Sequence, residues 1–207
     1  MYTFTTEFNL AVRGEEADEY IMDCVRTWPE LWGSIKGVTG TMLLSNAFAL
    51  GGDFEFQWRV GIESLGALAR IDETVKAGKG GWPKSRKEWF RNRTAVRSHI
   101  SGFVAGDKRY ITESKGTEGA IHAVISSASR GAKGFAESME SVHSMPEVMT
   151  TQMVRPMIGS AGSGEQVWVR MNDLEGLDAL ADKGLEVDNI RLFGEIREVD
   201  GALFEGA

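Results

Sequence analysis

The chain has 207 residues, of which 42% are hydrophobic and 26% are charged, an ordinary composition for a soluble globular protein. Its formal net charge of −7 argues against nucleic acid or an anionic membrane as a partner of the surface as a whole. The single cysteine, Cys24, excludes an intrachain disulfide, and no apolar run is long enough to span a membrane. The first residues are typical of a strand and not of a signal peptide, so we expect a cytoplasmic protein.

The first half of the chain alternates between patterns of strand and helix periodicity. Apolar Phe4 and Phe8 alternate with polar Thr5 and Glu7, which is typical of a strand with one buried face. Apolar residues then recur at helical spacing up to Pro29, which predicts an amphipathic helix that breaks or kinks there. The full prediction is the order β-α-β-β-α-β, with elements at 2–12, 15–28, 41–50, 54–62, 64–78 and 95–105.

The second half of the chain repeats this order and aligns with the first. The stretch VRTWPELW (25–32) matches VHSMPEVM (142–149) at an offset of 117, and VGIESLGAL (60–68) matches VRMNDLEGL (169–177) at an offset of 109. One deletion of eight residues reconciles the two offsets (117 − 109). We therefore predict two diverged copies, at 1–105 and 118–207, joined by a linker at 106–117.

The order β-α-β-β-α-β is that of the ferredoxin-like split motif, in which two helices cover one face of a four-stranded antiparallel sheet. The other face of the sheet must also be covered, and a second copy in the same chain can cover it. The prediction is an α+β fold in which two tandem ferredoxin-like repeats pack sheet to sheet and close a single-chain α+β barrel.

Two strand-to-helix passages carry a resemblance to a known group of proteins. FQWRVGIESLGALARI (56–71) and VWVRMNDLEGLDALA (167–181) resemble the third strand and second helix of the dimeric α+β barrel superfamily. That superfamily includes antibiotic-biosynthesis monooxygenases, EthD-like proteins and NIPSNAP-like proteins. The resemblance extends over nearly the whole chain at the level of pattern.

Strand alternation assigns side chains either to the helix-covered face or to the barrel interior. In 54–62, the apolar residues share one parity and are expected under the helices: Phe54, Phe56, Trp58, Val60 and Ile62. The interior set is then Glu55, Gln57 and Arg59, and its counterpart in the second copy is Gln166, Trp168 and Arg170. On the neighbouring strands, the interior candidates are His99, Phe103, His122, Ser126, Arg191 and Phe193.

These interior side chains would form a mostly apolar pocket with a few convergent polar groups, as small-molecule sites usually do. We predict three catalytic residues: Arg59, His122 and Arg170. The predicted substrate-binding residues are Asn46, Gln57, His99, Gln166 and Trp168, with the indole as a flat wall for an aromatic ligand. Structural alternatives stay open: histidines bonded to strand neighbours, arginines paired with Glu55 or Glu195, and an indole that is simply core. No Cys/His cluster has zinc spacing, so no metal is expected.

The segment GKGGWPKSRKEWFRNRTAVR (78–97) has no counterpart in the second copy and combines basic with aromatic residues. We interpret it as a structural arm or as a lid over the barrel, with Trp82, Arg86 and Trp89 as lid residues. Contact with an anion or a cofactor phosphate is one alternative. Single-stranded nucleic acid is another, although the acidic remainder of the chain argues against it. As a lid, the segment should be less ordered than the sheets, and its deletion should leave a folded protein.

The resemblance implies a small-molecule enzyme, most readily an oxygenase acting on a polycyclic aromatic or quinone-like metabolite. Relatives of this fold do such chemistry without a cofactor or with reduced flavin, and a haem occurs among them. The alternative is a non-catalytic small-molecule-binding or stress-response protein of the same fold. A barrel lumen filled with side chains would favour the binding protein, whereas an open lumen would favour the enzyme. We expect a small aromatic molecule as partner and allow for a homodimer.

Overall fold

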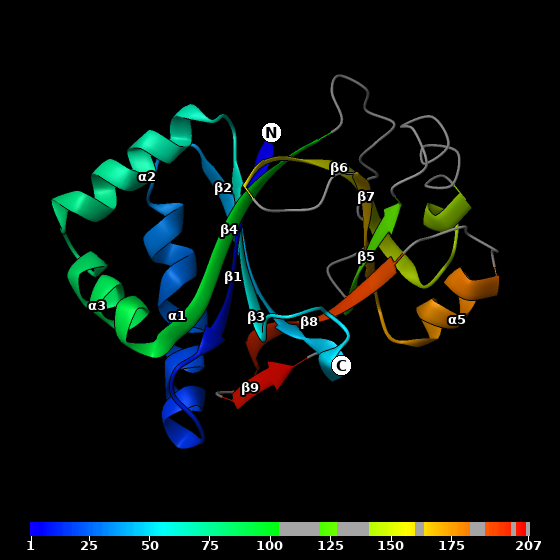
Figure 1. Ribbon diagram of the computed structural model, residues 1–207, viewed down its shortest axis with the longest axis horizontal. Coiled ribbons are helices and arrows are strands. Elements are labelled where there is room, and N and C mark those ends of the chain that lie inside the picture. Colours follow the sequence, from blue (N-terminus) through cyan, green and yellow to red (C-terminus); the bar gives the residue numbers. More distant parts are fainter. Residues whose placement is uncertain (104–120, 128–140, 160–163, 183–188, 200–201, 206–207) are drawn as a thin grey trace.

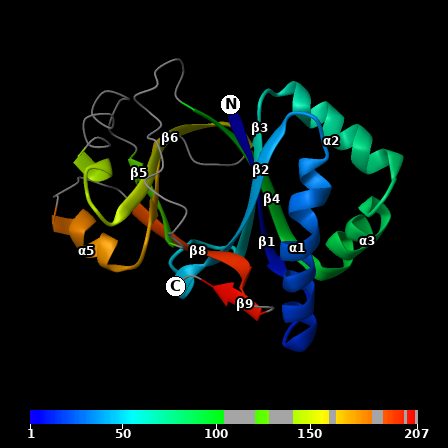
Figure 2. The ribbon, with the colours of Figure 1, turned by 180° about the vertical axis from the view of Figure 1, so that it is seen from behind.

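The computed structural model describes residues 1–103, 121–127, 141–159, 164–182, 189–199 and 202–205. Its strands form one antiparallel barrel with helices on the outside (Figures 1 and 2). Eight strands follow one another in the order β2-β3-β1-β4-β6-β7-β5-β8, and the barrel closes because β2 also pairs with β8. The predicted single-chain α+β barrel is confirmed. The tandem origin of its halves stays a prediction, and the predicted linker at 106–117 lies outside the described residues.

The first half of the chain forms one wall of the barrel. Its central strand, β1, pairs with β3 on one side and β4 on the other, and β2 extends the wall beyond β3. The helices of this half cover the outer face of the wall (Figure 1). The elements are β1 (Tyr2–Leu10), α1 (Glu15–Gly33), β2 (Val38–Asn46), the short 3-10 helix η1 (Ala47–Ala49), β3 (Phe56–Ile62), α2 (Gly66–Ala77), α3 (Trp82–Asn92) and β4 (Arg93–Phe103).

The second half forms the opposite wall with the same pairing scheme. Strand β5 lies between β7 and β8, and β6 pairs with β7. Helix α5 lies on the outer side of this wall (Figure 2). The elements are β5 (Ile121–Ser127), β6 (Val148–Gly159), β7 (Glu165–Met171), α5 (Glu175–Asp182), β8 (Asn189–Val199) and β9 (Ala202–Glu205), which pairs with the end of β8.

Two seams join the walls, β4 with β6 and β2 with β8. Strand β8 belongs to both walls. Its residue Leu192 packs into the apolar core of the second half, whereas Ile196 is opposite Leu43 and packs into the core of the first. Because backbone hydrogen bonds close both seams, the barrel has no open edge between its halves.

The core between the first wall and its helices is rich in tryptophan. The ring of Trp28 lies 4.7 Å from that of Trp58, and Trp32 lies 6.2 Å from Trp58. Each aromatic ring removes a large apolar area from water, so this cluster anchors α1 to β3. The helix-facing parity predicted for β3 and β7 is confirmed for the buried residues Trp58, Val60, Ile62, Val167, Val169 and Met171.

Helix α3 corrects the prediction of a lid. It packs on the outer helix layer, where Trp82 is buried and Trp89 stacks on Trp28 at 5.8 Å. Just beyond the helix, the buried guanidinium of Arg93 lies 4.1 Å from the centre of the Trp89 ring and 4.3 Å from that of Trp28. Indole burial and cation–π contacts make this segment part of the core, on the far side of the sheet from the lumen. The predicted lid residues Trp82, Arg86 and Trp89 therefore do not cover the barrel mouth.

Three local predictions also need correction. Helix α1 continues through Pro29 to Gly33, because burial of Trp32 stabilises the last turn and outweighs the backbone bond that proline removes. Strand β2 ends at Asn46, and η1 replaces its predicted continuation. Phe54 precedes β3 and lies over the Arg97 guanidinium at 4.6 Å instead of under the helices.

In the described part of the chain, no helix is both long and apolar enough to cross a membrane.

Candidate functional site

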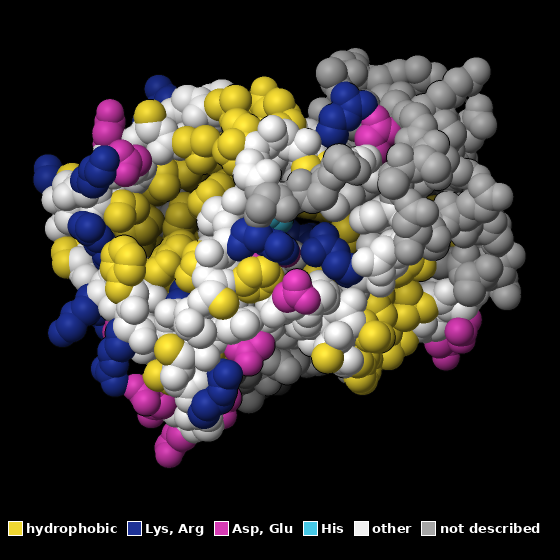
Figure 3. Space-filling model, viewed as in Figure 1, with side chains coloured by type: hydrophobic (Ala, Val, Ile, Leu, Met, Phe, Trp, Pro, Cys, Tyr) yellow, Lys and Arg dark blue, Asp and Glu magenta, His cyan; other side chains and the backbone are white. Residues whose placement is uncertain are grey.

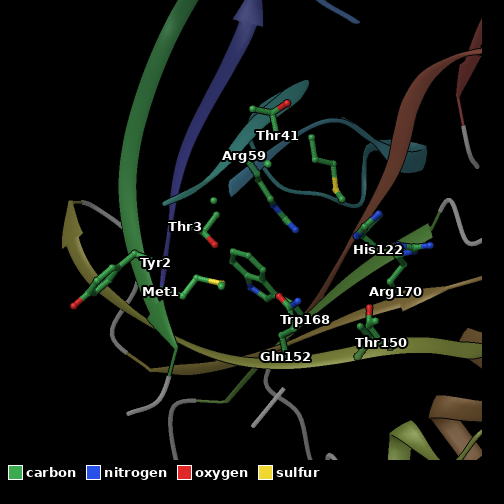
Figure 4. Close-up of a pocket in the computed structure, with 14 residues that line it drawn as sticks. Met1, Tyr2, Thr3, Thr41, Arg59, His122, Thr150, Gln152, Trp168 and Arg170 are labelled. Atoms are coloured by element: carbon green, nitrogen blue, oxygen red, sulfur yellow. The ribbon is translucent and has the colours of Figure 1, made fainter. Parts of the chain in front are cut away.

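A pocket of about 340 Å³ opens at the end of the barrel where β1 begins. Both walls contribute to it, and Figure 4 shows Arg59 on one side facing Trp168, His122 and Arg170 on the other. The volume is at the lower end of the range for small-molecule sites. The lining residues are Met1, Tyr2, Thr3, Gly40, Thr41, Met42, Arg59, Gly61, His122, Thr150, Gln152, Trp168, Val169 and Arg170.

The middle of the barrel is packed with side chains. Leu44 from the first wall meets Val124 and Phe193 from the second, and all three are buried. Met42 and Trp168 pack against this cluster. The lumen is therefore filled at its centre and hollow at the mouth where the pocket lies.

Arg59 lies at the boundary between the packed centre and the pocket. Its guanidinium lies 4.2 Å from the centre of the Trp168 ring, and both Nε and Nη2 donate to Oε1 of Gln57, at 3.1 and 2.8 Å. Burial lowers the pKa of Arg59 to about 9, with a further lowering by Arg191 that Glu7 opposes. The side chain therefore remains a cation at neutral pH, held by an amide and an indole.

Gln57 is oriented in turn by a buried carboxylate. Its Nε2 donates to Oε1 of Glu7 at 2.8 Å, so its amide oxygen is turned toward Arg59. The other carboxylate oxygen of Glu7 pairs with Arg97 at 2.6 Å, and Arg191 approaches Oε1 at 3.5 Å. A buried carboxylate is costly unless it is paired. Glu7 has these partners, and it fixes the geometry of Arg59 through Gln57.

His122 provides a neutral imidazole on the opposite side of the pocket. Its Nε2 lies 3.4 Å from Oε2 of Glu195. Burial lowers the pKa of His122; the bond to Glu195 raises it, and Arg59 and Arg170 lower it further. Burial raises the pKa of Glu195, but His122, Arg170 and Arg197 more than offset this, so the carboxyl titrates below its usual range. At neutral pH the pair is thus an imidazole beside a carboxylate.

Trp168 forms the aromatic wall of the pocket. Its Nε1 donates to Oε1 of Gln166 at 3.1 Å. This bond satisfies the only polar atom of the indole and leaves the ring to contact Arg59 and the pocket. The predicted aromatic wall thus borders both the pocket and the Arg59 cation.

The pocket brings together four of the predicted site residues: Arg59, His122, Trp168 and Arg170. Gln57 and Gln166 lie one step behind it, as hydrogen-bond partners of Arg59 and Trp168. His99 is buried beside Glu7, with Nδ1 3.9 Å from the carboxylate, and does not line the pocket. Among the other interior candidates, Arg191 approaches Glu7 and Phe193 packs at the centre of the lumen. Ser126 is opposite Gln166 on β7. The side chain of Phe103 lies outside the described residues.

Two predicted interior residues lie elsewhere. Asn46 ends β2, donates to the carbonyls of Gly52 and Phe54 at 2.9 and 3.0 Å, and accepts from the amide of Gly51. It braces this turn and does not reach the pocket. Glu55 lies before β3 begins and pairs with Arg13 at the surface, at 3.2 Å. Neither Arg59 nor Arg170 is paired with Glu55 among the ion pairs of the described residues.

The sequence interpretation missed Glu7 and the polar residues that surround the pocket mouth. Glu7 stood on the polar parity of the first strand, and its charge among apolar neighbours was the available signal. Thr3, Thr41, Thr150 and Gln152 carried no pattern that distinguishes them from exposed strand residues. Their shared location follows from the closure of the barrel.

The arrangement is poorly suited to the cofactors suggested at the sequence level. For a haem, His99 is enclosed by Glu7 and arginines, and the pocket of about 340 Å³ beside His122 is small for a macrocycle. For a flavin, the basic segment expected to hold its phosphate lies on the outer helix layer. The described residues contain no group of three His, Cys, Asp or Glu side chains that could hold a metal ion.

Comparison with known proteins supports the fold. No family model and no curated protein matches the sequence. A candidate monooxygenase from Fusobacterium nucleatum subsp. nucleatum superposes with a TM-score of 0.59 at 11% identity, covering 100% of this chain and 98% of that one. A candidate monooxygenase from Lactobacillus acidophilus has a TM-score of 0.54 at 11% identity, covering 100% and 99%. An anthrone oxidase-like protein has a TM-score of 0.53 at 9% identity, covering 95% and 91%. These likenesses show the α+β barrel fold.

Proposed function

We propose that the protein is a cofactor-independent oxygenase of hydroxylated polycyclic aromatic compounds of the anthrone type. The observation that carries the proposal is the neutral imidazole of His122, bonded to the Glu195 carboxylate, which shares one pocket with the cations Arg59 and Arg170 and the indole wall of Trp168. The names of two structural neighbours, a candidate monooxygenase and an anthrone oxidase-like protein, support the same class of reaction.

The reaction begins with the removal of a proton from the substrate. A neutral His122 accepts the acidic proton of the anthrone, and Glu195 stabilises the imidazolium that forms. Arg59 and Arg170 then stabilise the enolate by direct electrostatic attraction in a partly enclosed site. The aromatic rings of the substrate lie against Trp168.

The enolate then reacts with molecular oxygen. The ring carbon that carried the proton forms a bond to one oxygen atom of O2, and electrons move from the carbanion to oxygen. The imidazolium of His122 returns its proton to the peroxide, and the O–O bond breaks as the same ring carbon loses its second hydrogen as a proton. One oxygen atom stays as the new carbonyl and the other leaves as water, so anthrone and O2 give anthraquinone and water.

The test combines oxygen uptake with quinone absorbance in air-saturated buffer containing anthrone. The wild type should consume one O2 per quinone without added flavin, and His122→Gln should lower kcat by about 100-fold or more. Labelled O2 should place one label in the quinone. Turnover by the wild type only when reduced flavin is added would contradict a cofactor-independent reaction. No turnover either with or without reduced flavin would contradict the proposal that the protein is an oxygenase.

A binding protein without turnover is the second candidate, and the packed centre of the lumen favours it. In that case anthrone should quench the fluorescence of Trp168 without oxygen uptake. A Trp168→Phe variant should remove this quenching. The two candidates therefore differ in oxygen consumption and agree in ligand binding.

A further inference from the structure

We infer that the outer helix layer carries a second ligand site, for an apolar molecule with one anionic end, such as a medium-chain carboxylate. The site is a groove between α2 and α3, on the opposite side of the first wall from the barrel pocket. Figure 3 shows yellow hydrophobic side chains lining a hollow over these helices, with basic side chains around it. This ligand site is independent of the proposed oxygenase activity.

The floor of the groove is apolar. The groove has a volume of about 300 Å³. Leu68, Ile71 and Val75 line it from α2, and aromatic rings that include Trp82 and Trp89 line it from α3. Phe90 at its rim is 74% exposed, although nothing about a surface helix requires a large aromatic there. An exposed aromatic beside an apolar hollow of this size is typical of a binding surface.

The charges at the rim select the kind of ligand. Among the described residues that line the groove, Arg86 is the only cation, and its guanidinium lies 5.9 Å from the centre of the Phe90 ring. Within the described part of the chain, Arg86 forms no ion pair with a carboxylate, whereas Lys84 and Arg91 of the same helix are paired with Asp23 and Glu16. An unpaired guanidinium at the end of an apolar groove is complementary to a carboxylate on an apolar chain.

The acidic rim of the groove does not cancel this preference. Asp72 of α2 also lines the groove, but it is paired with Lys76 at 2.6 Å. The local balance around the open end is therefore positive, in a chain whose net charge is −7. Electrostatic complementarity of this kind selects among ligands more than it adds affinity, so the affinity should come from the apolar floor.

Tryptophan quenching by brominated probes tests the site, because a bromine atom quenches an indole only in contact. The probes are ω-bromoundecanoate and its uncharged match, ω-bromoundecanol, at concentrations below micelle formation. We expect saturable quenching, with the carboxylate bound more tightly than the alcohol. Arg86→Gln should weaken the carboxylate about threefold to fivefold and leave the alcohol unchanged. Phe90→Ala should weaken both probes.

Two controls place the probe. Lys87→Gln removes an exposed cation of the same helix that does not line the groove, and it should change neither affinity. Trp168→Phe removes the only tryptophan of the barrel pocket and should leave the quenching intact. The inference is overturned if neither probe quenches saturably, if Arg86→Gln binds the carboxylate as the wild type does, or if Trp168→Phe abolishes the quenching.

Discussion

The guanidinium of Arg59 lies 4.2 Å from the centre of the Trp168 ring, so one side chain from each wall of the barrel meets its counterpart inside the lumen. Arg59 comes from β3 and Trp168 from β7, the third strands of the two halves. A cation over an indole in a desolvated site contributes about 2 kcal/mol or more. The contact therefore couples the two halves at the pocket where we place the reaction.

Removing the indole should release Arg59. In Trp168→Leu, we expect the free energy of unfolding to fall by about 1–3 kcal/mol and the affinity for an anthrone-type anion to fall at least about tenfold. Urea unfolding and ligand titration measure the two effects. Trp168→Phe keeps an aromatic face and should retain most of the stability. Equal losses of stability in Trp168→Leu and Trp168→Phe would show that an aromatic face alone does not stabilise Arg59.

Arg170 should contribute to ligand binding more than to stability. Arg170→Ala removes one cation from the pocket, and we expect about tenfold weaker binding of an anionic aromatic ligand, with the binding of a neutral analogue unchanged. Arg13→Ala, which removes an exposed arginine paired with Glu55, is the matched control and should change neither. An Arg170→Ala protein with a lowered free energy of unfolding and an unchanged affinity would show that the residue is structural.

Glu7 should be a major determinant of barrel stability. Its carboxylate is buried, pairs with the partly buried Arg97 and Arg191, and offsets the charge of the buried Arg59, so Glu7→Ala should cost about 3–5 kcal/mol. Glu7→Gln keeps an acceptor for Gln57 and should cost less. Chemical denaturation of both variants gives the comparison. A cost within error of zero for Glu7→Ala would mean that the lumen arginines do not need this carboxylate.

Stability should fall on mild acidification because of the buried histidines. Burial and the nearby arginines lower the pKa of His99 to about 4, against an unfolded value of about 6.5, and the pKa of His122 is lowered as well. The unfolded chain therefore binds more protons in this window, so stability is complete above about pH 6.5 and is lost as pH falls toward 4. Urea unfolding between pH 7 and 5 should show a loss of at least about 1 kcal/mol.

The histidine responsible can be identified by substitution. His99→Gln should flatten the pH dependence of the free energy of unfolding. A slope that is the same in wild type and His99→Gln would mean that His99 is not buried in its neutral form.

Helix α3 should be essential to the fold. Trp82→Ala removes a buried ring from the outer core and should cost about 3–5 kcal/mol, and deletion of 79–93 should abolish folding. Phe90→Ala, on the same helix but 74% exposed, is the control and should leave the melting temperature nearly unchanged. A folded deletion variant would show that the outer core does not require α3.

The alternation of residues determined much of this protein without any structure. Apolar Trp58, Val60 and Ile62 against polar Gln57 and Arg59 predicted which face of β3 is covered by helices, and the same parity predicted that Trp168 and Arg170 point inward. Period two is a property of the extended backbone itself, so a strand can be divided into its two faces from sequence alone.

Only the tertiary structure decided how far along the lumen each interior residue lies and what it meets there. Parity gives a face and no partner, so it could not separate Arg59, which reaches the pocket, from Gln57, which is held behind it by Glu7. It also could not show that the basic segment of α3 packs outside the barrel, because Trp82 and Trp89 would be hydrophobic in a lid or a core alike. These outcomes depend on contacts between distant strands and helices, which local periodicity does not encode.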